Sequence, residues 1–240
     1  MNLQECPLVL KTPQVYSVLT GLQCFVYLDD IVVYAKTMKQ HTDKLRSIFD
    51  RLRSNNLLLQ PDKCEFMRKQ FSYLGHIISD KRVAPNPDKI KAISTYPAPQ
   101  NNKQIKQFLG LVGYYRCFIK NFSLIAKPLT QLLKKDVPFN WSPKVQESFE
   151  TVKTILTTEP ILQYSNFQEI FLLTTDASDF AIGAVLSQGV IGKDLPIAYA
   201  SRTLNKAEIN YSTTEKEALA IVWATNYFRP YLYSRKFIIL

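Results

Sequence analysis

The sequence is short of the residues that build disulfide frameworks and zinc sites. Its four cysteines are Cys6, Cys24, Cys64 and Cys117. None of them stands in a C-x-x-C pair, so neither a disulfide-stapled fold nor a zinc ribbon is indicated. The two histidines, His41 and His76, have no cysteine, histidine or acidic partner at metal-ligand spacing, and both are expected to be packing or surface residues.

Long hydrophobic runs are also missing. No apolar stretch has the length of about 20 residues that a membrane-spanning helix needs. The N-terminal residues lack the basic segment followed by an apolar core that marks a secretory signal. We therefore expect a soluble protein without a membrane partner, located inside the cell in the cytoplasm or the nucleus, with reduced thiols.

Negative charge is scarce relative to positive charge. Thirty Lys and Arg residues stand against 20 Asp and Glu residues, which gives a net charge of +10. Such a balance favours polyanionic partners, nucleic acid first, although a solvated basic surface is the alternative. An apolar share of 46% is enough to fill real cores, so a disordered chain is not expected.

The first third of the chain is rich in strand-forming residues. Residues 25–28 and 31–35 are aromatic or β-branched, and Asp29 and Asp30 lie at the break between them, which predicts a hairpin. Residues 37–59 have the spacing of an amphipathic helix. Residues 64–83 predict a second hairpin, with its turn near Arg68 to Gln70. A proline-rich tract follows, and we expect a domain boundary near Val83.

Helical patterns dominate the middle of the chain. Asn86 and Pro87 predict a helix start, and Ile105, Leu109, Val112 and Arg116 step along one helix face. Another helix is expected to begin at residues 142–143. Three strand-like runs at residues 169–178, 181–188 and 196–204 come next, then a helix from about Thr213 to Phe228 and a strand at residues 236–240.

The Asp29–Asp30 pair has two explanations. Aspartate is a favoured turn residue, because its side chain bonds nearby backbone amides. Enzymes that make or break phosphodiesters, however, hold two divalent ions about 3.5–4 Å apart, and magnesium prefers carboxylate ligands. A hairpin tip is a suitable support for such ligands, since the strands fix it and solvent reaches it.

The flanking residues favour the second explanation. "YLDD" between apolar runs, followed by a helix, "QPDKCEF" and "YLGHIIS", resembles the palm of a reverse transcriptase of gypsy-type long-terminal-repeat retrotransposons. The resemblance implies that Asp29 and Asp30 are catalytic metal ligands. It implies that the segment comprising Phe71, Tyr73, Leu74, Gly75 and His76 positions a primer end. The helices after Pro87 resemble the thumb, with phosphate contacts at Lys103, Lys106, Arg116 and Lys120, against the alternative of a solvated helix face.

Residues beyond 165 resemble the ribonuclease H domain of the same polyproteins. The family's metal-binding carboxylates match Asp176, after an apolar strand, and Glu217, in the first turn of a helix. Glu217 also fits a capping box with Thr214, as Glu215 does with Ser212, and Glu215 is favoured as the structural carboxylate. For Asp179 we favour a turn role.

The resemblance predicts an α+β chain with three parts. Residues 1–83 would be the C-terminal part of the palm, 84–165 the thumb and connecting helices, and 166–240 a truncated ribonuclease H-like domain with a mixed sheet. The implied activities are RNA-directed DNA synthesis and cleavage of RNA/DNA hybrids.

The implied cofactor is Mg²⁺ or Mn²⁺, and the implied partners are an RNA template, a DNA primer, an RNA/DNA hybrid and dNTPs. Because the family's third carboxylate at each site is not found in these 240 residues, we expect both activities to be impaired in this chain. The alternative is a non-catalytic nucleic-acid-binding remnant or a binding module retained by a host.

Overall fold

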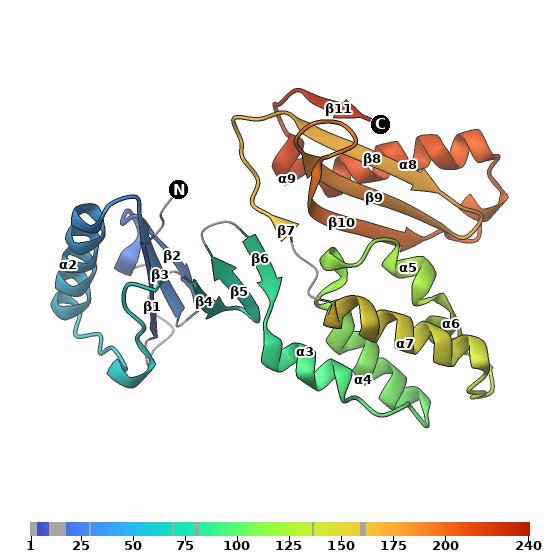
Figure 1. Ribbon diagram of the computed structural model, residues 1–240, viewed down its shortest axis with the longest axis horizontal. Helices are drawn as coiled ribbons and strands as arrows, with labels where there is room; N and C mark the ends of the chain where they lie inside the picture. The colour runs from blue at the N-terminus through green and yellow to red at the C-terminus, as the bar shows by residue number, and fades with distance from the viewer. Residues whose placement is uncertain are drawn as a thin grey trace. The chain divides into compact units, whose positions relative to one another are not determined.

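The computed structural model of the chain describes residues 4–9, 18–28, 30–68, 70–79, 82–135, 137–158 and 162–240 (Figure 1). The chain divides into two compact units, Met1–Arg82 and Val83–Leu240. The further division expected between residues 165 and 166 stays a prediction.

The first unit contains a sheet with the strand order β1–β3–β2. Its strands are β1 (Gln4–Val9), β2 (Cys24–Tyr27) and β3 (Asp30–Ala35), and both pairings are antiparallel. Tyr27 lies opposite Asp30, which confirms the predicted first hairpin. This register places Asp30 at the end of β3 next to the turn.

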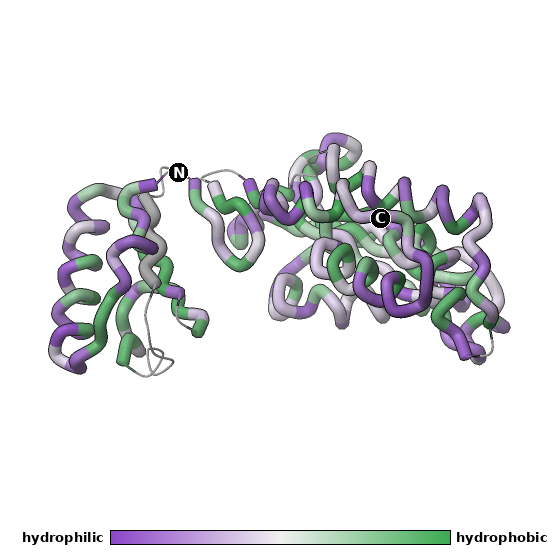
Figure 2. Tube along the Cα trace, turned by 90° about the horizontal axis from the view of Figure 1, so that it is seen from below, coloured by the Kyte–Doolittle hydropathy of each residue, from purple (hydrophilic) through white to green (hydrophobic). Residues whose placement is uncertain are grey.

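Helix α2 (Met38–Ser54) covers one face of this sheet. Thr37 caps it, because its side chain accepts a hydrogen bond from the backbone N–H of Gln40 at 3.3 Å. The buried side chains of the helix pack against Ile31 and Val33 of β3. Figure 2 shows the alternation of hydrophobic and hydrophilic residues along this helix, and the predicted amphipathic helix is thereby confirmed.

The turn of the second hairpin was placed wrongly by the sequence. After a short 3-10 helix, η1 (Pro61–Lys63), strands β4 (Gln70–Tyr73) and β5 (His76–Ser79) pair so that Tyr73 lies opposite His76. The turn is therefore Leu74–Gly75 and not Arg68 to Gln70. Both turn residues have positive φ, 47° for Leu74 and 72° for Gly75. Two-residue hairpin turns need this geometry, and Leu gives no sequence signal for it.

The second unit begins with a set of packed helices. They are α3 (Pro87–Ser94), α4 (Asn102–Gly113), η2 (Arg116–Phe118), α5 (Phe122–Ile125), α6 (Lys127–Gln131) and α7 (Pro143–Thr157), and strand β6 (Arg82–Pro85) precedes them. Asn86 caps α3 as predicted. Helix α7 starts at Pro143, and Val145, Phe149, Val152 and Leu156 form its buried stripe.

Helix α4 is shorter than the sequence pattern suggested. Its buried positions are Ile105, Phe108 and Val112, and it ends at Gly113. Arg116 therefore does not continue this helix and lies in η2. Glycine is a poor helix former, and Tyr115, two residues after Gly113, is buried in the core.

A mixed sheet completes the second unit, as predicted. Strands β8 (Phe171–Ala177), β9 (Ala181–Gln188), β10 (Leu195–Thr203) and β11 (Phe237–Ile239) have the order β10–β9–β8–β11. β11 pairs with β8 in parallel, and the other pairs are antiparallel. The remaining elements are β7 (Leu162–Gln163), η3 (Glu208–Asn210), α8 (Thr213–Tyr227) and α9 (Arg229–Leu232). The α+β class is confirmed.

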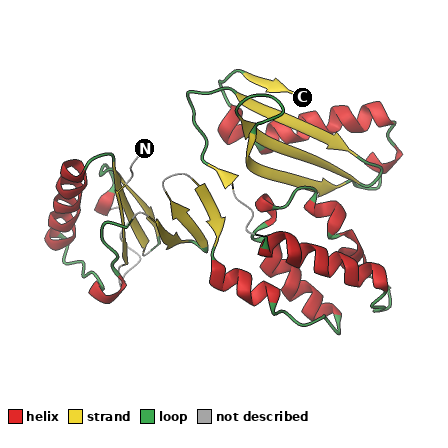
Figure 3. Ribbon diagram, viewed as in Figure 1, coloured by secondary structure: helices red, strands yellow, loops and turns green. Residues whose placement is uncertain are grey.

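The two faces of this sheet have different neighbours (Figure 3). On one face, Phe171 and Leu173 of β8 pack with Ala224 of α8. On the other face, the helices before the sheet lie against β10, where the Ser123 backbone N–H donates to Ser201 Oγ at 2.9 Å. Residues along a strand alternate between the faces, so the register decides which side each polar residue takes.

Within the described ranges, no helix combines the length and the apolar character needed to cross a membrane.

Candidate metal and nucleic-acid sites

Asp30 is the member of the predicted Asp29–Asp30 pair that lies within the described residues. It is half-buried at the start of β3, opposite Tyr27. Ile31 and Val33 face α2, so alternation puts Asp30 on the opposite face of the sheet. Its predicted companion, Asp29, lies outside the described residues.

The β4–β5 hairpin reaches the neighbourhood of Asp30. Burial raises the pKa of the Tyr73 phenol, and the nearby charges of Asp30 and Tyr27 raise it further. Tyr73 and Asp30 were both predicted site residues, and the fold therefore brings them together. Phe71 is buried, and Leu74 and Gly75 form the turn. Burial lowers the pKa of His76, which keeps its imidazole neutral at pH 7.

Asp176 lies on the sheet face that carries the helices α5 to α7. Asp176 of β8 pairs with Gly183 of β9, and Gly183 pairs in turn with Ser201 of β10, the next strand of the sheet. A small pocket is lined here by Asp176, Asn121, Ser178, Gly183 and Ser201, among others. The predicted carboxylate is thus exposed at a small pocket whose lining mixes polar residues with the apolar Leu124, Ala181 and Ile182.

Glu217 is placed on helix α8, which packs on the other sheet face. The capping box at the helix start is formed by Ser212 and Glu215, with the Ser212 N–H donating to Glu215 Oε2 at 2.8 Å. These bonds lower the pKa of Glu215, the backbone bond most. Glu217 has no part in this cap and is half-buried, so its carboxylate stays available for another role.

Asp179 has a partner that the sequence did not reveal. Its Oδ1 lies 3.0 Å from the ammonium nitrogen of Lys216, whose side chain is only 9% exposed. Asp179 therefore neutralises a buried lysine, in addition to its place in the turn after β8.

The chemistry of these side chains suits a hard divalent cation, but their number at any one place is small. Asp30, Asp176 and Glu217 offer the carboxylate oxygens that Mg²⁺ prefers. Among the described residues, no group of three His, Cys, Asp or Glu side chains is close enough to hold a metal ion.

The predicted phosphate contacts are all exposed basic side chains. Lys103 and Lys106 lie on α4, Arg116 in η2, and Lys120 just before α5. Since the structure contains no nucleic acid, their contact role stays a prediction.

Asn121 is a site residue that sequence reasoning missed. It has a left-handed backbone with φ of 55°, and its side chain lies against Gly183. A Cβ on Gly183 would be 2.6 Å from Asn121 Oδ1, so a larger residue here requires the amide to shift. A glycine inside a strand pattern can indicate such a close approach, and Gly183 was the available signal.

Two family models match this chain in the order that the fold suggests. Residues 5–78 match "Reverse transcriptase (RNA-dependent DNA polymerase)". Residues 141–239 match "RNase H-like domain found in reverse transcriptase". The retrovirus-related Pol polyprotein from transposon 297 of Drosophila melanogaster is 48% identical over 223 residues, which cover 92% of this chain and 21% of that polyprotein. The chain belongs to the retrotransposon Pol polyproteins.

Other Pol polyproteins are similar over nearly the same span. The Tf2-3 transposon polyprotein of Schizosaccharomyces pombe is 39% identical over 209 residues, covering 87% of the chain. The chain spans about a fifth of the length of these Pol polyproteins, 21% and 16% in the two cases. It carries their reverse transcriptase and RNase H-like sequences.

Solved structures show the same fold at low sequence identity. The foamy viral protease-reverse transcriptase dRH in complex with double-stranded DNA has a TM-score of 0.87 and 18% identity, covering 98% of this chain and 49% of that one. The same viral protein in complex with an RNA/DNA hybrid has a TM-score of 0.85 and 19% identity, covering 98% of this chain and 38% of that one.

Proposed function

We propose that this Pol chain takes part in RNA-directed DNA synthesis and in cleavage of the RNA strand of RNA/DNA hybrids. The observation that carries the proposal is the succession of a reverse transcriptase match and an RNase H-like match within one chain. The net charge of +10 supports a nucleic-acid partner. An RNA template, a DNA primer and dNTPs would be the partners of the first reaction.

In this proposal Asp29 and Asp30 serve polymerisation, and Asp176 and Glu217 serve hybrid cleavage. Their carboxylates would hold Mg²⁺ or Mn²⁺, which when bound activates the attacking oxygen and supports the leaving oxygen. The residues from Phe71 to His76 would position the primer end. The proximity of Tyr73 to Asp30 supports this role, because it brings the hairpin to the carboxylate.

Hybrid cleavage is tested with a labelled RNA/DNA hybrid and Mg²⁺ or Mn²⁺, resolved on a gel. Asp176→Asn and Glu217→Gln should abolish whatever cleavage the chain performs. Glu215→Gln is the matched control, because glutamine also closes a capping box on the same helix. Cleavage that survives Asp176→Asn contradicts the assignment.

Primer extension is tested on a primed RNA template with the same metal ions. Asp30→Asn should remove extension, whereas Asp50→Asn should not, since Asp50 is an exposed residue of α2. Both activities are expected to be weak in these 240 residues. Strong extension or cleavage would contradict that expectation of impairment while supporting the carboxylate assignment.

The second candidate is nucleic-acid binding without catalysis. Two observations favour it. Asp176 and α8 lie on opposite faces of the sheet. The basic side chains predicted to contact phosphate are exposed, namely Lys103, Lys106, Arg116 and Lys120. It predicts hybrid binding that weakens steeply with salt and is unchanged by Asp176→Asn. Absence of any hybrid binding by the wild-type chain would reject both candidates.

A further inference from the structure

Three lysines stand at the ends of the packed helices α6 and α7. They are Lys127 at the start of α6, Lys134 beyond its end and Lys144 in the first turn of α7, and we call them the α6–α7 lysine cluster. The Ser148 hydroxyl of α7 donates to the Ile125 carbonyl at 2.6 Å, which holds the starts of the two helices together. Lys134 and Lys144 are exposed. Burial lowers the pKa of Lys127, and the charges of Lys144 and Lys134 lower it further. In the described part of the chain, none of the three forms an ion pair with a carboxylate.

An aromatic ring fixes the central lysine of the cluster. The Lys127 Nζ lies 2.9 Å from the ring centre of Phe180. Such a cation–π contact orients an ammonium group without neutralising its charge. Phe180 is 49% exposed, so the contact lies at the surface, where a polyanion can approach.

The ring belongs to the turn that borders the Asp176 pocket. Phe180 lies between β8 and β9, and its neighbours Ser178 and Ala181 both line that pocket. The turn is well held, since Ser178 Oγ accepts from the Ala181 N–H at 3.1 Å and the Leu204 N–H donates to the Phe180 carbonyl at 2.8 Å. Lys127 is therefore held at the turn that borders the Asp176 pocket.

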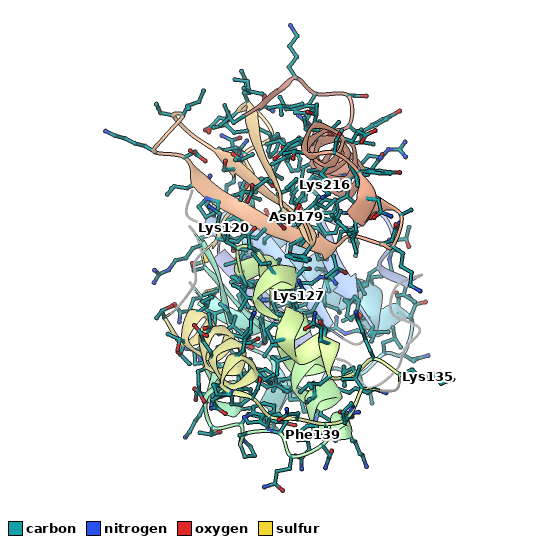
Figure 4. The ribbon with its side chains drawn as sticks, turned by 90° about the vertical axis from the view of Figure 1, so that its right-hand side faces the viewer. Lys120, Lys127, Lys135, Phe139, Asp179 and Lys216 are labelled. Atoms are coloured by element: carbon teal, nitrogen blue, oxygen red, sulfur yellow. The ribbon has the colours of Figure 1, made fainter. Side chains whose placement is uncertain are left out.

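The carboxylate of this turn is already engaged elsewhere. Asp179 forms its ion pair with Lys216 on α8, and Figure 4 shows Lys127 on the helical side of the turn that carries Asp179. Three mutually repelling ammonium groups are stabilised when a polyanion binds to them. Lysine is a compact point charge that suits phosphate oxygens, and a nucleic-acid backbone presents phosphates at regular intervals.

We propose that the α6–α7 lysine cluster binds the phosphate backbone of a nucleic-acid strand that runs past Asp176. This inference rests on the proposed function, because it takes the RNA/DNA hybrid as the substrate at Asp176. It adds a contact surface separate from Lys103, Lys106, Arg116 and Lys120. Lys127 would be a positioning residue, which sets where the strand lies relative to the carboxylate.

The test is a salt titration of binding to a fluorescently labelled RNA/DNA hybrid, measured by anisotropy with the full 240-residue chain. Lys127→Gln and Lys144→Gln should each weaken binding and reduce the slope of log affinity against log salt by about 0.7 to 0.9. Lys193→Gln is the matched control, because Lys193 is an exposed lysine beyond the far end of β9. It should leave the slope unchanged.

The outcomes separate this inference from the proposed function. Wild-type binding with unchanged slopes in both cluster variants, or an equal loss in Lys193→Gln, overturns the inference and leaves the proposed function standing. No hybrid binding by the wild-type chain overturns both. Tighter binding of poly-glutamate than of hybrid would assign the cluster to an acidic protein instead. If Lys127→Gln fails to fold, Lys144→Gln still decides the test, because Lys144 is exposed and its replacement should not unfold the protein.

Discussion

At the residue scale, Gly183 determines the shape of the Asp176 pocket. Alanine at this position would place its Cβ 2.6 Å from Asn121 Oδ1, and the amide would have to move. We expect Gly183→Ala to destabilise the second unit by up to about 1 kcal/mol, because Oδ1 is the end of a side chain that can turn away. Adding Asn121→Gly should restore most of this loss, because glycine accepts the φ of 55° and removes the amide. Urea unfolding measures both variants.

Gly110 provides the control for that substitution. It lies in helix α4 with no atom within 4 Å of an added Cβ. Gly110→Ala should therefore stabilise the protein by about 0.5 to 1 kcal/mol, since alanine is the better helix former. Equal effects at Gly110 and Gly183 would show that the close approach of Asn121 is unimportant.

A second residue-scale prediction concerns pH. Glu208 accepts hydrogen bonds from Arg202 at 2.6 and 2.9 Å and from the Asn205 N–H, and these interactions lower its pKa below the ordinary 4.5. Its stabilising effect is complete above about pH 4.5 and is lost as the pH falls through the lowered pKa. Glu208→Gln should cost about 1 to 3 kcal/mol near pH 7 and little in strong acid. The free energy of unfolding is measured with urea at several pH values for the wild type, Glu208→Gln and the control Glu147→Gln. A difference between the wild type and Glu208→Gln that does not change with pH would contradict this prediction.

At the element scale, Leu74 occupies a backbone conformation that suits it poorly. A left-handed φ of 47° costs a leucine about 1 to 2 kcal/mol, whereas asparagine tolerates it. Leu74→Asn creates the Asn-Gly pair that two-residue hairpins prefer. We expect the first unit to gain about 1 kcal/mol, measured by thermal unfolding. Gly75→Ala should have the opposite sign, because φ is 72° there.

The same turn shows what the sequence could and could not predict. Helices α2 and α7 and strands β8 to β10 follow from periodicity and capping residues, because these signals are local. The turn at Leu74 could not be predicted, because its geometry depends on how the two strands pair. A leucine in the sequence does not indicate a turn. The candidate carboxylates were predicted from the family resemblance. Asn121 lines the Asp176 pocket, and Lys127 contacts Phe180, only because the helices that carry them pack on the sheet. Contacts of that kind have no periodic signature.

At the scale of the whole molecule, each unit has its own hydrophobic core. The core of the first unit includes Ile48, and a core of the second includes Phe149, with no buried residue in common. Separate cores favour separate unfolding transitions. Both tryptophans, Trp141 and Trp223, lie in the second unit, so tryptophan fluorescence reports that unit alone while circular dichroism reports both.

We therefore expect two core substitutions to affect different transitions. Phe149→Ala should destabilise the second unit by about 3 to 5 kcal/mol and shift the fluorescence transition to lower urea. Ile48→Ala should destabilise the first unit by about 2 to 5 kcal/mol and shift only a part of the circular dichroism signal. A fluorescence midpoint that moves equally in both variants would mean that the two units unfold as one. In that case a substitution in the first unit would also weaken the sheet that carries Asp176.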